Sequence, residues 1–323
     1  MKVLLPPNLA STPSRVSSGP VVLVIGLGLI GEAIVGEMVA GGYSEEATIP
    51  MLWGSQDGLK VAVNQAIDHV SLCLPKDVRF SLPSQVMVVW SAGKAGFGCN
   101  RQQLEEELAN YKVVVDQFLA RKPQGWQLGF CLFSSAGGLY EGQANIHLTS
   151  PFSIKRPYGE LKLAQEQYLE SIAEIYPKII LRPSGVYGRI NLGKRMGLIP
   201  TMIYHGLYYQ VTRLVGSYHT LRDFVWADDV GRFVRDVLTT ADFSQPDYLE
   251  KIVLATGKPS SIYEIKKKIE AVLHRNLYVA FAGENNGENI TYLKPTHPFW
   301  KTSSETECIR QVYCDWVGSG FRV

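Results

Sequence analysis

The sequence has no long hydrophobic run, little excess charge of either sign and no signal peptide pattern. No stretch approaches the ~18 apolar residues that a membrane span needs. Residues 1–20 are rich in Ser and Pro and lack the charged-then-apolar order of a secretory leader. A net charge of +2 over 323 residues gives no electrostatic reason to expect nucleic acid binding. We therefore predict a cytoplasmic protein that binds neither membrane nor nucleic acid, with residues 1–20 as a flexible extension.

The sequence also lacks a paired cysteine motif. Its five cysteines, at positions 73, 99, 131, 308 and 314, form no C-x-x-C pair. This spacing favours buried reduced thiols over a disulfide framework, and we predict no metal site. The composition, 46% hydrophobic and 19% charged, is ordinary for a globular enzyme.

Strands and helices alternate through the first half, which is typical of an α/β fold with a parallel sheet. The predicted strands are 21–25, 48–53, 86–90, 128–133 and 178–181, and the predicted helices are 31–40, 101–120, 158–175 and 199–205. Residues 54–83 show no clear pattern. After Arg182 the loops lengthen, although 262–274 is again helical. We predict a dinucleotide-binding domain over 21–185 and a mainly substrate-binding portion over 186–323, from which some segments return to the first domain.

A glycine-rich loop follows the first apolar strand of that domain. Gly26, Gly28 and Gly31 form G-x-G-x-x-G, and Leu29 and Ile30 lead into an apolar helix. In this motif the first glycine permits a tight turn, the second lets a pyrophosphate approach the backbone, and the third allows the helix to pack on the strand. The helix N-terminus then points at the phosphates. The strand-loop-helix context predicts a dinucleotide site of the Rossmann type.

Tyr158 and Lys162 are four residues apart, so on a helix they share one face. A free tyrosine loses its proton only near pH ~10 and is a poor base at neutral pH. A neighbouring cation favours the phenolate. A tyrosine with such a neighbour can exchange a proton with a sugar hydroxyl.

Further segments follow in a fixed order. Asn110 precedes the strand that leads into Ser134-Ser135-Ala136-Gly137-Gly138-Leu139-Tyr140. Tyr158 and Lys162 come next, and Arg182-Pro183-Ser184-Gly185-Val186-Tyr187-Gly188 follows them. The last segment is Arg222-Asp223-Phe224-Val225-Trp226-Ala227-Asp228-Asp229. Together, over residues 20 to 275, these segments resemble the extended short-chain dehydrogenase/reductase family, in its nucleotide-sugar epimerase/dehydratase branch. The resemblance implies a Rossmann-type doubly wound sheet with a smaller C-terminal substrate-binding portion.

The resemblance also implies roles for single residues. Tyr158 is then the catalytic acid/base, and Lys162 favours its phenolate and hydrogen-bonds the nicotinamide ribose. A serine after the strand holds the substrate oxygen: Ser135 is the first choice and Ser134 the second, because the loop has one residue more than the common family spacing. The other serine then serves as a turn cap.

The remaining implied residues surround these. Asn110 matches the position that supports the catalytic helix. Arg222 matches the arginine that binds the sugar-nucleotide diphosphate, since a guanidinium pairs with phosphate oxygens; alternatively it pairs with Asp228 or Asp229. The implied cofactor-binding residues are Gly26, Gly28, Leu29, Ile30, Gly31, Ser55, Ser91, Ala92, Lys162 and Pro183, and the implied substrate-binding residues are Arg222, Gly93, Lys94 and Tyr187.

The sequence departs from the family pattern in four places. No carboxylate follows the second predicted strand, where an acid would bind the NAD ribose, so both NAD and NADP stay open. Ala136-Gly137-Gly138 stands where dehydratases carry an acidic pair, which favours epimerase or reductase chemistry. Gly185 replaces an asparagine that touches the nucleotide. Residues 90–97 replace a small-residue turn, and Lys94 is either a substrate contact or a solvated loop lysine.

The sequence therefore predicts an NAD(P)-dependent nucleotide-sugar epimerase that acts through a keto-sugar. The alternatives are an NADPH-dependent ketoreductase of a nucleotide-linked keto-sugar or of a small carbonyl compound, and a non-catalytic dinucleotide sensor. The last is disfavoured because a binding module would not need Tyr158 and Lys162. Dimerisation through the 101–120 and 158–175 helices is typical of the family, so we predict a homodimer.

Overall fold

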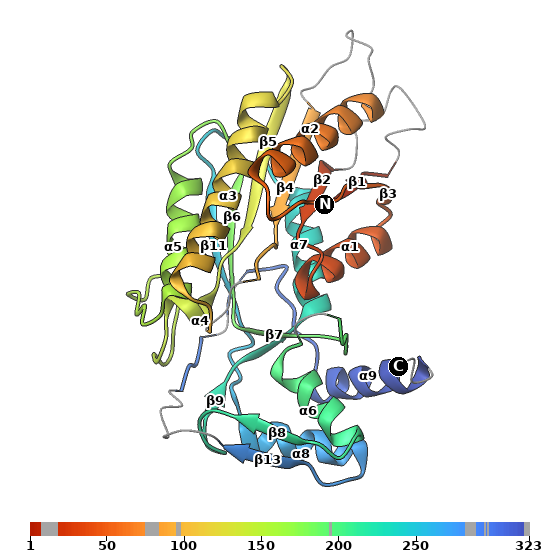
Figure 1. The fold of residues 1–323 in the computed structure, drawn as a ribbon, viewed down its shortest axis with the longest axis vertical. Helices are drawn as coiled ribbons and strands as arrows, with labels where there is room; N and C mark the ends of the chain where they lie inside the picture. Colours follow the sequence, from red (N-terminus) through yellow and green to blue (C-terminus); the bar gives the residue numbers. More distant parts are fainter. Residues whose placement is uncertain are drawn as a thin grey trace.

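The computed structural model describes residues 1–7, 19–74, 84–94, 98–193, 196–281, 289–293, 295 and 297–319. Figure 1 shows a central sheet with helices on both faces and a second, smaller group of helices and short strands below it. The predicted α/β fold with a doubly wound sheet is confirmed.

The central sheet has seven strands in the order β11-β6-β5-β4-β2-β1-β3. Their bounds are β1 Lys2–Leu5, β2 Val21–Ile25, β3 Ser44–Thr48, β4 Ser84–Trp90, β5 Trp126–Phe133, β6 Lys178–Pro183 and β11 Leu249–Leu254. The pairs from β2 through β4, β5 and β6 to β11 are all parallel. Every residue of β2 and β6 is buried, as expected for strands that are covered on both faces.

Two layers of helices cover the sheet. α1 (Leu29–Ala40) and α7 (Ala227–Thr240) pack together on one face. α2 (Gln56–Cys73), α3 (Arg101–Arg121) and α5 (Pro157–Glu170) cover the other face. In β1, β2, β4 and β5, the apolar side chains alternate between the two resulting cores.

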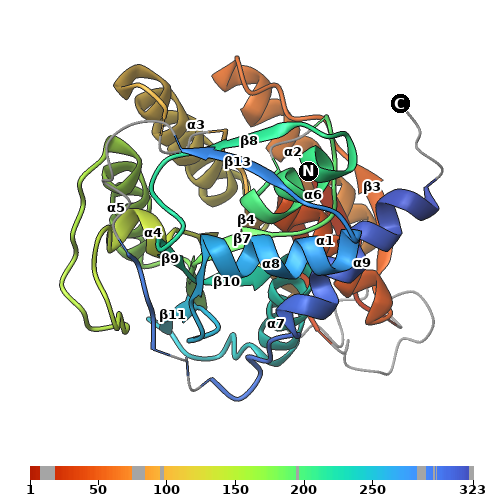
Figure 2. The same cartoon turned by 90° about the horizontal axis from the view of Figure 1, so that it is seen from below.

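The smaller part is built from the chain after β6 and is seen from below in Figure 2. It comprises β7 Gly185–Tyr187, α6 Leu198–Leu207, β8 Val211–Leu214, β9 Leu221–Arg222, β10 Phe224–Trp226, β12 Ser260–Ser261, α8 Ile262–Leu273, β13 Tyr278–Phe281 and α9 Glu305–Gly318. α6, α8 and α9 share a third core. α7 and β11 belong instead to the large sheet and its helices, so the late chain contributes to both parts.

The prediction that the first 20 residues form a flexible extension is wrong for β1. Lys2–Leu5 lies inside the sheet, antiparallel to both β2 and β3. Val3 and Leu4 are fully buried because both faces of the sheet are covered there. Residues 8–18 lie outside the described part of the chain.

Two predicted boundaries are also wrong. The strand predicted over 48–53 is β3, Ser44–Thr48, and ends before Pro50, whose nitrogen cannot donate to a strand ladder. The helix predicted over 158–175 ends at Glu170. Ile172 and Ile175 continue a helical spacing, but they are buried from the turn that follows α5. The unassigned stretch 54–83 contains α2, and its residues 75–83 are not described.

The expectation of buried, reduced cysteines holds for part of the set. All five cysteines are free; Cys131 and Cys308 are buried, whereas Cys314 is exposed. None of the helices in the described residues combines the length and apolar character that a membrane span requires.

A buried ion pair fastens α5 to the sheet. Arg182 on β6 donates to both carboxylate oxygens of Glu166, at 2.9 and 2.6 Å, and to the Tyr140 hydroxyl at 2.6 Å. The side chains of Arg182 and Glu166 are 2% and 0% exposed. Because both charged groups are shielded from solvent, removal of one partner leaves an uncompensated charge in the core.

We expect Glu166→Gln to lower the free energy of unfolding by about 3–5 kcal/mol, because Arg182 stays buried without its counter-ion. Urea unfolding followed by circular dichroism measures the change. Glu160→Gln is the matched control, because Glu160 lies on α5 like Glu166 and also forms an ion pair, with Arg101 of α3 at 3.2 Å. The Glu160 side chain is 54% exposed, so we expect its substitution to lower the free energy of unfolding by less than about 1 kcal/mol. Equal losses for the two variants would contradict the assigned role of the buried pair.

Candidate active site

The carboxyl ends of β2, β4, β5 and β6 meet at one edge of the sheet, because these strands are parallel. Such an edge is where ligands bind in open α/β sheets. The glycine loop follows β2, Ser91 follows β4, and Ser134 follows β5 at this edge. The predicted site residues therefore come from segments that the topology brings together.

Each glycine of the loop has the environment that its predicted role requires. Gly26 has a φ of +95°, and a Cβ there would lie 2.3 Å from the backbone of Ala92. A Cβ on Gly31 would lie 1.9 Å from the Gly26 carbonyl oxygen, so α1 packs directly on the turn. Gly28 has no atom within 4 Å of its Cβ position, which leaves space for a ligand against the backbone. Ser91 secures the turn by donating its hydroxyl to the Gly26 carbonyl at 2.8 Å.

The first turn of α1 presents unused backbone donors. α1 begins at Leu29, and its N-cap, Gly28, offers no side-chain hydrogen bond. The first N–H groups of a helix have no partner within it. Together with the positive end of the helix dipole, such groups attract an anion, for example a pyrophosphate.

Tyr158 and Lys162 both lie on α5, with the Lys162 Nζ atom 5.8 Å from the centroid of the Tyr158 ring. The Lys162 side chain is buried, and its ammonium donates to the Phe133 carbonyl at 3.2 Å and to the Gln165 side-chain oxygen at 3.1 Å. Lys162 thereby joins α5 to the end of β5. The shared helix face predicted for the pair is present.

The short helix α4, Ala136–Leu139, lies against the start of α5. A Cβ on Gly138 would lie 3.1 Å from two carbons of the Tyr158 ring, and a Cβ on Gly159 would lie 2.2 Å from the Gly138 carbonyl oxygen. The two glycines therefore allow the backbones to touch. This contact fixes the position of the Tyr158 ring relative to the serine-containing loop.

The two candidate serines differ in what their hydroxyls do. The Ser135 hydroxyl accepts from the Gly138 N–H at 3.1 Å and caps α4. The Ser134 hydroxyl is buried and has no hydrogen-bond partner in the described part of the chain. The two hydroxyls therefore differ: the Ser135 hydroxyl is engaged by the α4 cap, whereas the Ser134 hydroxyl keeps its hydrogen-bonding capacity among the described residues.

The predicted residues on the α2–α3 side hold loops together. Asn110 on α3 donates its side-chain amide to the Trp53 carbonyl at 3.1 Å, and so anchors the loop between β3 and α2. Ser55 caps α2 by accepting from the Gly58 N–H at 3.1 Å. Asp57 lies in the first turn of α2 and pairs with Lys60 at 3.6 Å. Neither carboxylate nor arginine follows β3 directly, as expected from the sequence.

Glu107 on α3 is a residue of this region that the sequence analysis missed. Its carboxylate accepts from the Lys94 N–H at 3.0 Å, and a Cβ on Gly93 would lie 2.8 Å from its other oxygen. Glu107 therefore fixes the turn after β4 that carries Ser91 and Ala92. The side chain of Lys94 is exposed at this turn. Residues 95–97 lie outside the described residues.

The other two predicted substrate residues, Tyr187 on β7 and Arg222 on β9, belong to the smaller part. Arg222 on β9 is half-buried and donates to the Leu221 carbonyl at 2.9 Å. Its charge acts on Tyr292, although burial is the larger effect and raises the pKa of Tyr292. Asp228 pairs with Arg189, and Asp229 pairs with Arg232.

Two neighbours of Arg222 have packing roles. Asp223 accepts hydrogen bonds from Ser184, Thr256 and Gly257, which uses both of its oxygens. Tyr187 is buried between Phe224 and Trp226, with ring centroids 6.3 and 5.3 Å away. Burial also raises the pKa of Tyr187. Tyr187 therefore faces a core rather than an open site. Pro183 ends β6 beside Leu254.

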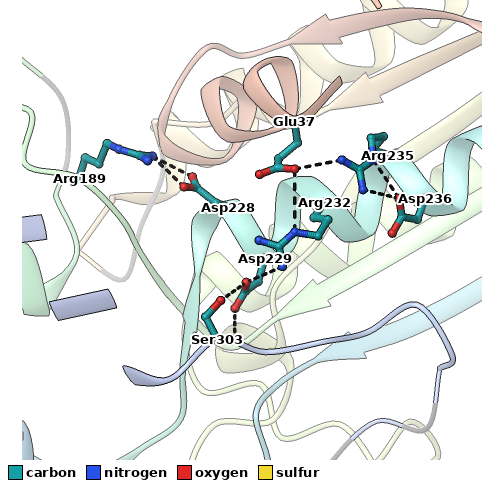
Figure 3. A network of polar contacts seen from close by, with 8 residues as sticks. All are labelled: Glu37, Arg189, Asp228, Asp229, Arg232, Arg235, Asp236 and Ser303. Carbon is teal, nitrogen blue, oxygen red and sulfur yellow. Dashed lines mark hydrogen bonds and ion pairs between the residues drawn. The ribbon is translucent and has the colours of Figure 1, made fainter. Parts of the chain in front are cut away.

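A polar network joins the two parts of the molecule on the α1–α7 face (Figure 3). Arg189 pairs with Asp228 on α7 at 2.9 Å, as Figure 3 shows. It also pairs with Asp315 on α9, at 2.8 Å. Asp229 accepts from the Ser303 N–H at 2.6 Å. A cavity of about 510 Å³ opens beside this network; its lining residues are Leu29, Glu32, Ala33, Gly36, Glu37, Arg189, Ile190, Asn191, Met196, Ala227 and Asp228. Tyr158 and Lys162 do not line it.

Comparison with known proteins gives a family and a fold. The model of the NAD dependent epimerase/dehydratase family matches residues 22–249. No curated protein is similar enough in sequence to count as a match. Among solved structures, MoeE5 in complex with UDP-glucose and NAD is 18% identical, with a TM-score of 0.70, and the match covers 93% of this chain and 99% of that one.

Two UDP-glucose 4-epimerases show the same fold. The enzyme from Thermus thermophilus, in complex with NAD, is 19% identical with a TM-score of 0.69, over 92% of this chain and 99% of that one. The enzyme from Thermotoga maritima, with UDP-glucose, is 16% identical with a TM-score of 0.68, over 93% and 99%.

A pair of glycine substitutions on α1 tests the cofactor loop. Gly31→Ala places a methyl group against the Gly26 carbonyl, so the loop must shift, and we expect NADH to bind at least about tenfold more weakly. Gly36→Ala is the control on the same helix, because its Cβ position is open; we expect unchanged binding and about 0.5–1 kcal/mol more stability. NADH fluorescence titration measures both. Unchanged binding in Gly31→Ala would contradict this assignment of the loop.

Proposed function

The chain belongs to the NAD-dependent epimerase/dehydratase family, and from that premise we propose that it is a nucleotide-sugar epimerase that acts through a transient keto-sugar. The observation that carries the proposal is the pairing of Tyr158 with Lys162 on α5, at the sheet edge that also holds the glycine loop and Ser134. A protein that only bound a dinucleotide would need the loop but not this pair.

The residues at the edge fit a nicotinamide dinucleotide. The open backbone at Gly28 and the uncapped start of α1 suit the pyrophosphate. Lys162 would hold the nicotinamide ribose, and the turn of Ser91 and Ala92 lies beside the loop. When bound, the cofactor accepts a hydride from the sugar carbon and returns it.

The chain itself moves the proton and stabilises charge. The Tyr158 phenolate takes the proton of the sugar hydroxyl and gives it back in the second half of the reaction. The buried Lys162 ammonium favours the phenolate through its charge. The Ser134 hydroxyl donates to the sugar oxygen as its carbonyl develops; it is buried and has no protein partner among the described residues.

Substrate recognition is proposed on chemistry and on the neighbours. Arg222 offers a guanidinium to the diphosphate of a nucleotide sugar. Solved structures with this fold hold UDP-glucose or NAD. The three residues after the serines, Ala136, Gly137 and Gly138, have no acidic side chain, which favours epimerisation over water elimination. We further propose a cytoplasmic homodimer that pairs through α3 and α5 and binds no nucleic acid, with the domain division at about residue 185.

We expect Tyr158→Phe to lower the rate of UDP-glucose to UDP-galactose conversion by at least about 100-fold, because the proton then has no acceptor. NADH binding should persist. Tyr168→Phe is the control, since Tyr168 lies on the same helix but hydrogen-bonds Asp116, and its rate should stay close to that of the wild type. Mass spectrometry of the dinucleotide released on denaturation separates an epimerase, which retains NAD, from a reductase, which is purified empty and binds NADPH. Wild-type protein without activity on any UDP-sugar would overturn the proposal.

Alanine substitutions separate the two serines. We expect Ser134→Ala to lower kcat by about 10- to 1,000-fold at little cost in stability, because a donor to the developing charge is lost. Ser135→Ala should instead lower the unfolding free energy by about 1 kcal/mol through loss of the α4 cap, with a smaller effect on kcat. Steady-state kinetics and urea unfolding measure the two effects. The opposite result would restore the first choice made from the sequence.

A further inference from the structure

Gln165 is a polar residue that the proposed mechanism does not use. Its side chain lies on α5 one turn after Lys162 and is fully buried, at 0% exposure. Its amide oxygen accepts from the Lys162 ammonium at 3.1 Å, an orientation that is fixed because an ammonium only donates. Its amide nitrogen has no partner in the described part of the chain.

An unpaired buried amide is expensive, so its presence requires a reason. A buried polar group without a hydrogen bond destabilises a fold, whereas an apolar side chain of similar shape does not. Methionine or leucine would fill this position on α5 without leaving a nitrogen unpaired. Natural chains keep such locally unfavourable choices mainly at functional sites. Among the described residues, the only hydrogen bond of the Gln165 side-chain amide is the one from Lys162.

The geometry of the ammonium gives this contact a consequence. An ammonium has three N–H donors in tetrahedral arrangement. Two of them bind oxygens of the protein, at Phe133 and Gln165. With two directions fixed, the direction of the third N–H is fixed as well. That third donor has no partner in the ranges that the structure describes.

We propose that Gln165 is a positioning residue, which together with the Phe133 carbonyl holds the Lys162 ammonium so that its third donor and its charge serve the cofactor ribose and the Tyr158 phenolate. The inference rests on the proposed function. The Phe133 carbonyl belongs to the backbone, so Gln165 is the side chain through which this alignment can be changed.

The elements packed against α5 carry further titratable groups, and each stays constant in the test. Glu166 lies on α5 itself, Arg182 on β6, Tyr140 after α4, and Glu107 and Tyr111 on α3. Glu166 and Arg182 neutralise each other in the buried ion pair, and burial raises the pKa of Tyr111. A change at Gln165 therefore acts on Lys162 and Tyr158 against an unaltered background.

The test replaces Gln165 by methionine, which keeps the length of the side chain and removes the acceptor. We expect NADH to bind Gln165→Met about 10- to 100-fold more weakly, the loss typical of one hydrogen bond to a charged group. The acid limb of the kcat profile should move up by about one pH unit, because the displaced ammonium favours the phenolate less. Gln167→Met is the matched control, since Gln167 is exposed on the same helix, and neither quantity should change.

A folded Gln165→Met protein with wild-type NADH affinity and pH profile would overturn the proposal. If methionine prevents folding, Gln165→Glu decides instead. It keeps an acceptor oxygen, so NADH affinity should stay within about threefold, while its negative charge opposes the phenolate and moves the acid limb up. An unmoved acid limb in Gln165→Glu would likewise overturn the proposal.

These results separate the positioning role from the proposed function. NADH titration needs no substrate. The tyrosinate absorbance difference between each protein and its Tyr158→Phe counterpart follows the phenol without turnover. Altered NADH binding and phenol ionisation in a protein that converts no UDP-sugar would retain the role of Gln165 and reject the epimerase. Conversion of a UDP-sugar by the wild type, together with unchanged NADH binding and phenol ionisation in the Gln165 variants, would retain the epimerase and reject the positioning role.

Discussion

The position of α5 on the sheet edge is the constraint on which the site depends. Gly159 and Gly138 let the backbones of α5 and α4 touch, since a Cβ on Gly159 would lie 2.2 Å from the Gly138 carbonyl oxygen. One turn later Lys162 binds the end of β5, and a further turn on Glu166 binds Arg182 on β6. The helix is held at three successive turns, which fixes the direction that its Tyr158 and Lys162 face takes. Tyr158 and Lys162 owe their positions to these contacts, because a helix alone fixes only their spacing.

The adenosine side of the cofactor site is arranged differently from the nicotinamide side. In a doubly wound sheet, the acid that binds the ribose follows the parallel strand beside the glycine-loop strand. Here the neighbour of β2 is β1, which is antiparallel, so its amino end lies at the binding edge and Lys2 is opposite Val24. β3 is displaced by one strand. The missing carboxylate after β3 therefore accompanies a different strand arrangement, in which the antiparallel β1 lies between β2 and β3.

Some of these features could be predicted because their causes are local. The apolar run of β2, the glycines at 26, 28 and 31, and the spacing of Tyr158 and Lys162 act within a few residues. The structure bears out each glycine through a clash or an open space that the motif implies. Predictions failed where distant contacts decide. Ile172 and Ile175 have helical spacing but pack from a turn. Which of the two serine hydroxyls caps α4 is likewise not given by any local pattern.

The sequence by itself therefore determined the strand-loop-helix with its three glycines, the shared helix face of Tyr158 and Lys162, and the family, because these follow from short-range sterics and spacing. Only the tertiary structure decided that residues 2–5 lie inside the sheet, since their burial depends on strands and helices far along the chain. It also decided which serine hydroxyl caps α4 and that Gln165 contacts Lys162, because both depend on how α4, α5 and β5 pack. Hydrogen bonds between elements join residues that are far apart in the sequence, so the pattern of neighbouring residues does not predict them.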